Sequence, residues 1–158
     1  MRRFIVILSF IFIPFISLFA QVVVSSGSPN LDVQLKRCVA MGNDVYIDLV
    51  LTGNGRWEKV AIIGEDCRAY DDEGNMYKGG FMGGGDYRYG ISFEYDKVTN
   101  RSGCGLDIPQ DIPRKVRVKI LDVNEYAAQF IKIILSCEGN WSSANPFQIV
   151  IKNLPISR

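Results

Sequence analysis

Apolar residues recur at every second position along much of this chain, which is the spacing of a β-strand with one buried face. The clearest case is the segment 45–52, where Val45, Ile47, Leu49 and Leu51 occupy alternate positions. Further strands are expected at 31–38, 57–63, 67–71, 76–82, 87–95, 116–121, 131–137 and 147–152. Because no stretch carries three turns of an amphipathic helix, the sequence predicts an all-β fold of eight or nine short strands.

Turn-forming residues separate these segments and indicate how the strands are connected. The segment 71–77 has an acidic and glycine-containing centre between β-favouring flanks, which is typical of a hairpin. The long connection at 100–113 contains two prolines and suits a crossover between sheets better than a meander of hairpins. The sequence therefore predicts an immunoglobulin-like, two-sheet antiparallel sandwich over residues 31–158, with a closed barrel as the competing architecture.

The first residues have the composition of an export signal. Arg2 and Arg3 precede an apolar run that ends at Ala20, so we expect a secretory signal peptide over 1–20 that is cleaved near Ala20. The alternative is an uncleaved N-terminal anchor, since the apolar run is at the lower limit for spanning a bilayer. Residues 21–30 are rich in serine, glycine and proline and are expected to form a flexible lead-in. The mature chain is then periplasmic or secreted, without a transmembrane segment.

Charge and composition exclude several function classes. Cleavage after Ala20 removes two of the 18 basic residues and none of the 17 acidic ones, which leaves one net negative charge. Such a balance argues against a nucleic-acid partner, whose phosphates require a basic face. The chain has no histidine, so catalysis through a histidine base or a histidine-ligated metal is excluded. We therefore expect a non-enzymatic protein without a cofactor or metal.

Four cysteines follow the predicted signal peptide: Cys38, Cys67, Cys104 and Cys137. An even number of cysteines in a short exported chain predicts structural disulfides, whereas the spacings of zinc ribbons and of redox Cys-x-x-Cys motifs are absent. Spacing alone allows three pairings. We favour Cys38 with Cys137 and Cys67 with Cys104.

Aromatic residues are the candidates for ligand binding, because they bring a large apolar area with little loss of entropy. The candidates are Trp57, Tyr87, Tyr89, Tyr95 and Trp141. If they are exposed together, they can stack on sugars or anchor a protein partner. If they are buried, they belong to the core.

Four segments resemble secreted bacterial immunoglobulin-like β-sandwich domains of unknown function. These are the strand 45–52, the turn 71–77, the Ile112-Pro113 approach to a basic strand, and the closing segment 147–153. The resemblance implies a sandwich fold and an extracytoplasmic location, and it brings no catalytic residues. We thus expect a domain that contacts a protein or cell-envelope component. A carbohydrate-binding module that holds a glycan on exposed aromatics is the alternative.

Overall fold

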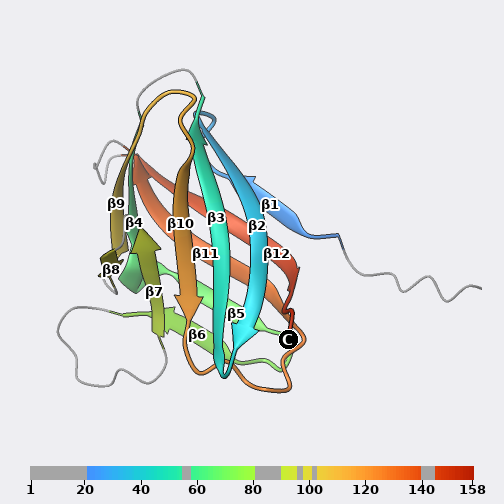
Figure 1. The fold of residues 1–158 in the computed structure, drawn as a ribbon. Coiled ribbons are helices and arrows are strands. Elements are labelled where there is room, and N and C mark those ends of the chain that lie inside the picture. Colours follow the sequence, from blue (N-terminus) through green and yellow to red (C-terminus); the bar gives the residue numbers. More distant parts are fainter. Residues whose placement is uncertain (1–20, 55–57, 81–89, 96–97, 101–102, 140–144) are drawn as a thin grey trace, which may run out of the picture.

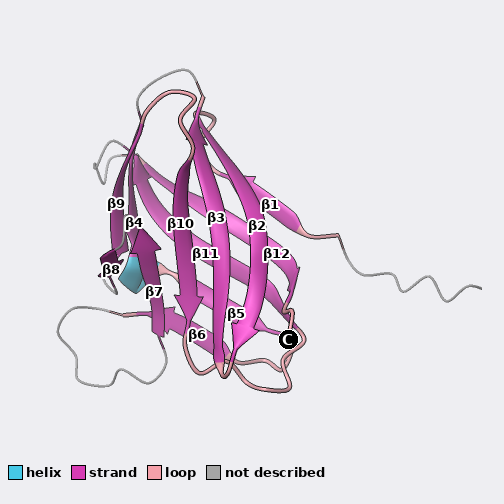
Figure 2. Cartoon of the chain, viewed as in Figure 1, coloured by secondary structure: helices cyan, strands magenta, loops and turns pink. Residues whose placement is uncertain are grey.

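The computed structural model describes residues 21–54, 58–80, 90–95, 98–100, 103–139 and 145–158. Within these ranges the chain is all-β, as predicted: twelve strands join in one hydrogen-bonded sheet, and the helical element drawn in cyan in Figure 2 is the short 3-10 turn η1 (Gly64–Asp66). The predicted signal peptide over 1–20 lies outside the described residues. The strands are β1 (Val23–Ser26), β2 (Leu31–Met41), β3 (Asp44–Gly53), β4 (Glu58–Ile63), β5 (Arg68–Asp71), β6 (Met76–Gly79), β7 (Gly90–Tyr95), β8 (Val98–Asn100), β9 (Gly103–Ile108), β10 (Arg114–Ile120), β11 (Gln129–Gly139) and β12 (Pro146–Pro155).

The sheet curves back on itself and is nearly closed. Its main path runs β1-β12-β11-β5-β6-β7-β10-β3-β2, with β4 and β9 continuing from β11 and β8 beside β7. Figure 1 shows β7, β10, β3 and β2 as a front layer that crosses in front of β11 and β12. The short parallel pairing of β6 with β7 joins the two layers. The two layers also meet where β2 approaches the chain after β12, and there the Ala40 N–H donates to the Ser157 carbonyl oxygen at 2.8 Å. The sheet is thus one barrel-like surface rather than two separate sheets.

The alternation that predicted β3 also determines which of its residues face the core. Val45, Ile47, Leu49 and Leu51 are fully buried, whereas the residues between them are half-buried on the outer face. Gly42 makes the turn from β2 with a φ of 64°, a conformation that glycine adopts without strain. The resulting β2–β3 hairpin presents a rigid outer face.

One extra residue in β2 changes which side chains point outward. The register with β3 shifts between Leu35 and Arg37, so Lys36 and Arg37 form a β-bulge. Both are exposed although they are adjacent in sequence. Before the bulge Leu35 faces the core, and after it Cys38 does. A bulge therefore places two neighbouring cations on the same outer face.

Two segments that were expected to be irregular, 21–30 and 100–113, contain strands. The lead-in over 21–30 contains β1, which pairs with β12 from Val23 to Ser26. Val22 and Val24 pack against the core, and this apolar contact holds a segment whose serines and glycine suggested flexibility. The connection 100–113 contains β9, where Cys104, Leu106 and Ile108 alternate as buried residues. The predicted long crossover is therefore replaced by a strand, and the described residues form twelve strands instead of the expected eight or nine.

The predicted hairpin at 71–77 is confirmed by the pairing of β5 with β6. Its turn is organised by the Asp71 carboxylate, which is buried and accepts hydrogen bonds from the backbone N–H groups of Glu73 and Asn75, the Asn75 side-chain amide and the Tyr77 hydroxyl. The Tyr77 hydroxyl in turn accepts from the Asn124 N–H at 3.1 Å. The acidic turn is thus a structural hub that connects the hairpin to the loop before β11.

The predicted disulfides are corrected by the structure, in which Cys38, Cys67, Cys104 and Cys137 are buried free thiols. The favoured Cys38–Cys137 pairing is wrong because the two residues lie at opposite ends of the sheet. Cys38 is next to Val39, which forms a bridge with Ser157, whereas Cys137 pairs with Phe147. The extended chain between Phe147 and Ser157 spans about 30 Å, so the two cysteines are far apart.

Strand register also separates Cys104 from Cys137. Both residues pair with Ile62, one on each side of β4. Their Cα atoms are therefore two strand spacings apart, about 9.5 Å, which exceeds the roughly 7 Å that a disulfide can bridge. The other favoured pairing, Cys67 with Cys104, is not formed either: both are free thiols, and the Cys67 thiol donates to the Ile63 carbonyl oxygen at 3.2 Å instead.

The buried thiols should resist modification in the folded protein. Burial raises the pKa of Cys38, Cys67 and Cys104 to about 12 and that of Cys137 further, so almost no reactive thiolate forms near neutral pH. We expect negligible reaction with Ellman's reagent in native buffer and the full yield of four thiols after unfolding without reductant. A yield of two or none from unfolded, unreduced protein would show that disulfides form.

Candidate binding groove

The outer face of the front layer carries an alternating row of charges. Arg37 of β2, Asp48 of β3, Arg117 of β10 and Glu94 of β7 are successive cross-strand neighbours. The Asp48 carboxylate accepts hydrogen bonds from both arginines, and the distance from Arg117 Nε to Asp48 Oδ1 is 2.7 Å. Arg117 also contacts Glu94 at 3.4 Å. Each charge in this row therefore has an opposite neighbour.

The ion pair between Asp48 and Arg117 favours the charged form of both side chains. Partial burial raises the pKa of Asp48, but hydrogen bonds and charges from Arg117 and Arg37 outweigh it and hold the pKa below its ordinary value. The same hydrogen bond raises the pKa of Arg117. The row thus remains a fixed, neutral framework near physiological pH.

The next row repeats the arrangement around an aromatic ring. Lys119 forms an ion pair with Asp44 at 2.8 Å, and this contact raises the pKa of the lysine. The Lys119 ammonium lies 5.2 Å from the centre of the Tyr46 ring, and the Arg117 guanidinium lies 5.8 Å from it. These are cation–π distances, so Tyr46 helps to hold both cations in place.

A hollow lies on the other side of the charge row. It has a volume of about 440 Å³. Three members of the charge row, Asp48, Glu94 and Arg117, line it together with Lys36, Tyr95 and Lys115. A second hollow of about 440 Å³ shares Lys36, Val50 and Lys115 with the first. The two hollows together form what we call the outer groove.

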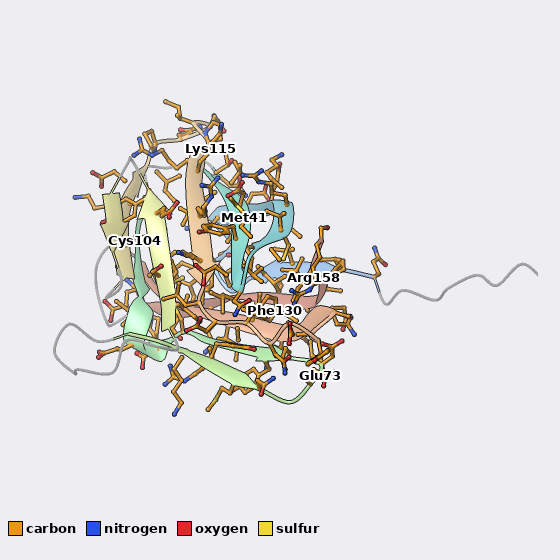
Figure 3. All side chains as sticks on the ribbon, turned by 60° about the horizontal axis from the view of Figure 1, so that its bottom comes forward. Met41, Glu73, Cys104, Lys115, Phe130 and Arg158 are labelled. Carbon is orange, nitrogen blue, oxygen red and sulfur yellow. The ribbon has the colours of Figure 1, made fainter. Side chains whose placement is uncertain are left out.

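The half-buried Val50 forms an apolar floor at the centre of the outer groove, and a lysine stands on each side of it. Lys115 is its cross-strand neighbour on β10, and Lys36 comes from the bulge in β2. Figure 3 shows Lys115 at the outer margin of the molecule. Lys36 donates only to the uncharged Gln34, at 3.0 Å, and Lys115 has no hydrogen-bond or ion-pair partner among the described residues. Asp111 lines the second hollow and offsets part of their charge.

Of the aromatic residues predicted to bind ligands, only Tyr95 belongs to the described part of the chain. It is half-buried, packs against the core and lines the outer groove. Trp57, Tyr87, Tyr89 and Trp141 lie outside the described residues. The two lysines were not predicted. The change of alternation phase between Leu35 and Cys38 is the sequence signal that could have identified the bulge and hence Lys36.

In the described ranges, no group of three or more cysteines, aspartates or glutamates is placed to hold a metal ion. None of the described segments forms a helix with the length and apolar character needed to cross a membrane. Comparisons with protein-family models, with characterised proteins and with solved structures found no match to this chain.

Proposed function

We propose that this chain is an exported, non-catalytic binding domain that contacts a protein or cell-envelope partner through the outer groove. We also propose that the fold is a variant of the immunoglobulin-like sandwich, in which the β6–β7 pairing joins the two layers into one sheet. The observation that supports the binding role is the pair Lys36 and Lys115 on either side of Val50, beside a charge row that is already neutral. A partner that supplies a carboxylate and a small apolar group matches this arrangement.

The rigidity of the site supports the same role. Its lysines project from paired strands instead of from loops, and the ion pairs around Asp48 fix the adjacent side chains. A preformed site loses little conformational entropy when it binds. The two hollows follow each other along β3, from Asp48 to Thr52, which suits an extended acidic segment of a larger partner.

The proposal is tested by capture of a partner from envelope extract, with the wild type compared with Lys36→Glu/Lys115→Glu. We expect one reproducible protein species with the wild type and at least about a tenfold loss with the variant, because two attractive contacts become repulsive. The matched control is Lys132→Glu/Lys152→Glu, which reverses two charges elsewhere and should retain the species. Equal recovery by both variants, or no recovery by the wild type, would contradict the proposal.

Carbohydrate binding is the second function expected from the sequence. It is supported by exposed cations beside the Tyr70 ring, on the other face of the molecule.

A further inference from the structure

The strands β6, β5, β11, β12 and β1 form the back layer, and its outer face has a row of five exposed residues that crosses all five strands. Met76, Tyr70, Lys132, Lys152 and Val23 are successive cross-strand neighbours on β6, β5, β11, β12 and β1. All five are exposed, and the exposed fraction of Tyr70 is 36%. The row thus presents two cations and an aromatic ring side by side.

The neighbouring row on the same face adds two more cations. Lys78 and Arg68 are cross-strand neighbours, and each is two residues from a member of the first row on the same strand. Lys78 is exposed and Arg68 is half-buried. We call Arg68, Lys78, Lys132, Lys152 and Tyr70 the basic stripe.

The basic stripe contains two pairs of like charges in direct opposition, Lys132 with Lys152 and Lys78 with Arg68. Among the described residues, no carboxylate forms an ion pair with any of these cations. Arg68 donates only to the carbonyl oxygens of Glu65 and Cys67. Like charges in direct opposition destabilise a sheet, and an anion placed between them removes the repulsion.

Acidic residues close to the stripe in sequence do not pair with these cations. Asp66 lies two residues before Arg68 and Glu73 five residues before Lys78, and neither forms an ion pair with them. Glu138 is on β11 but about 20 Å along the strand from Lys132. Asp72 lies in the β5–β6 turn, where its carboxylate accepts from the N–H groups of Ala128 and Gln129. The charge row of the front layer, by contrast, is neutralised by ion pairs between neighbouring strands. The near-zero net charge of the chain therefore conceals a basic face.

The size of the stripe indicates a narrow ligand. Five strands span about 19 Å, and the two rows are about 7 Å apart, so the area is a small fraction of the roughly 800 Å² that each partner contributes to a stable protein interface. A second copy of this face would repel the first. Insertion into a membrane requires a continuous apolar surface, whereas here the exposed apolar residues share their row with Lys132 and Lys152.

A linear polyanion fits these dimensions, and the composition of the stripe favours a sugar polymer. Tyr70 provides one exposed ring beside the cations, on which the apolar face of a sugar can pack. Single-stranded nucleic acid is held instead by successive aromatic rings that stack successive bases. We propose that the basic stripe binds an anionic polysaccharide that lies across the strands, with its acidic groups between the paired cations and a sugar ring on Tyr70.

The test measures binding of a fluorescent oligogalacturonate to the purified protein by fluorescence anisotropy. We expect saturable binding that weakens with salt, and at least about a tenfold loss in Lys132→Gln/Lys152→Gln. Tyr70→Ala should weaken binding without changing its salt dependence. The matched control Lys36→Gln/Lys115→Gln should bind as the wild type does, so failure of this proposal is distinguishable from failure of the outer-groove proposal.

Two controls keep the test decisive. The methyl-esterified oligomer has the same sugars without the charges and should not bind. Because Lys132→Gln/Lys152→Gln removes a repulsive pair, its melting temperature should equal or exceed that of the wild type, which shows that lost binding is not lost folding. Equal binding of the esterified oligomer, unchanged binding by the variant, or tighter binding of an oligothymidylate or of anionic lipid vesicles would overturn the proposal.

Discussion

Asp71→Ala is expected to lower the free energy of unfolding by about 3 kcal/mol, because it leaves buried hydrogen-bond donors without an acceptor. The Tyr77 hydroxyl lies 2.7 Å from Asp71 Oδ2 and is the most deeply buried of these donors. Burial and the neighbouring carboxylate raise the pKa of Tyr77 to about 12, so the hydroxyl remains protonated and donates. Chemical denaturation of the two proteins measures the difference. Glu73→Ala in the same turn is the control and should change stability by less than about 0.5 kcal/mol, since Glu73 is exposed.

The stabilisation by Asp71 should depend on pH. Burial raises the pKa of this carboxyl, but hydrogen bonds from Asn75, Tyr77 and the Glu73 backbone outweigh it and lower the pKa below its ordinary value of 3.8. The charged form is therefore favoured in the folded state, and its contribution is fully present above pH 3.8 and lost as the pH falls through the lower folded pKa. We expect the stability difference between the wild type and Asp71→Asn to shrink below pH 3.8. A difference that stays constant down to full protonation would contradict this role of the charge.

Phe130→Ala should lower the free energy of unfolding by about 4 kcal/mol, because it empties a fully buried site in β11. The Phe130 ring meets the Tyr77 ring edge-on, with centroids 6.1 Å apart, so the change also removes a contact of the hairpin hub. Thermal or denaturant unfolding measures the loss.

The adjacent residue is a matched control for this substitution. Ile131 lies in the β11 bulge and is 49% exposed, so Ile131→Ala should cost about 1 kcal/mol or less. Phe130→Leu, which keeps most of the apolar volume, should lie between the two. Equal losses for Phe130→Ala and Ile131→Ala would show that the bulge does not separate core from surface as described.

The sequence predicts those elements whose structure depends on residues close together in the chain. The β3 alternation and the 71–77 turn could be read directly, because each depends on residues that are neighbours in sequence. The strand β1 was missed because Ser25 and Gly27 suggested a lead-in, and its order depends on β12, more than a hundred residues away. The strand β9 was not predicted although Cys104, Leu106 and Ile108 alternate, since its glycines and the prolines that follow it favour a loop.

The candidate sites could not be predicted because they depend on strand order. Lys36 and Lys115 become neighbours only when β2 and β10 both pair with β3. Likewise Tyr70 and Lys132 meet because β5 pairs with β11. An even cysteine count predicted disulfides, but only the three-dimensional register shows that Cys104 and Cys137 stand on opposite sides of Ile62.

The seam between β2 and the chain after β12 has a consequence for association. Ala40 and Ser157 hydrogen-bond across it, so part of the β2 edge is occupied within the molecule. A strand with unpaired N–H and C=O groups acts as a template on which other chains can assemble. Because the chain's own backbone occupies this part of the β2 edge, we expect no edge-to-edge assembly through it, even at high protein concentration.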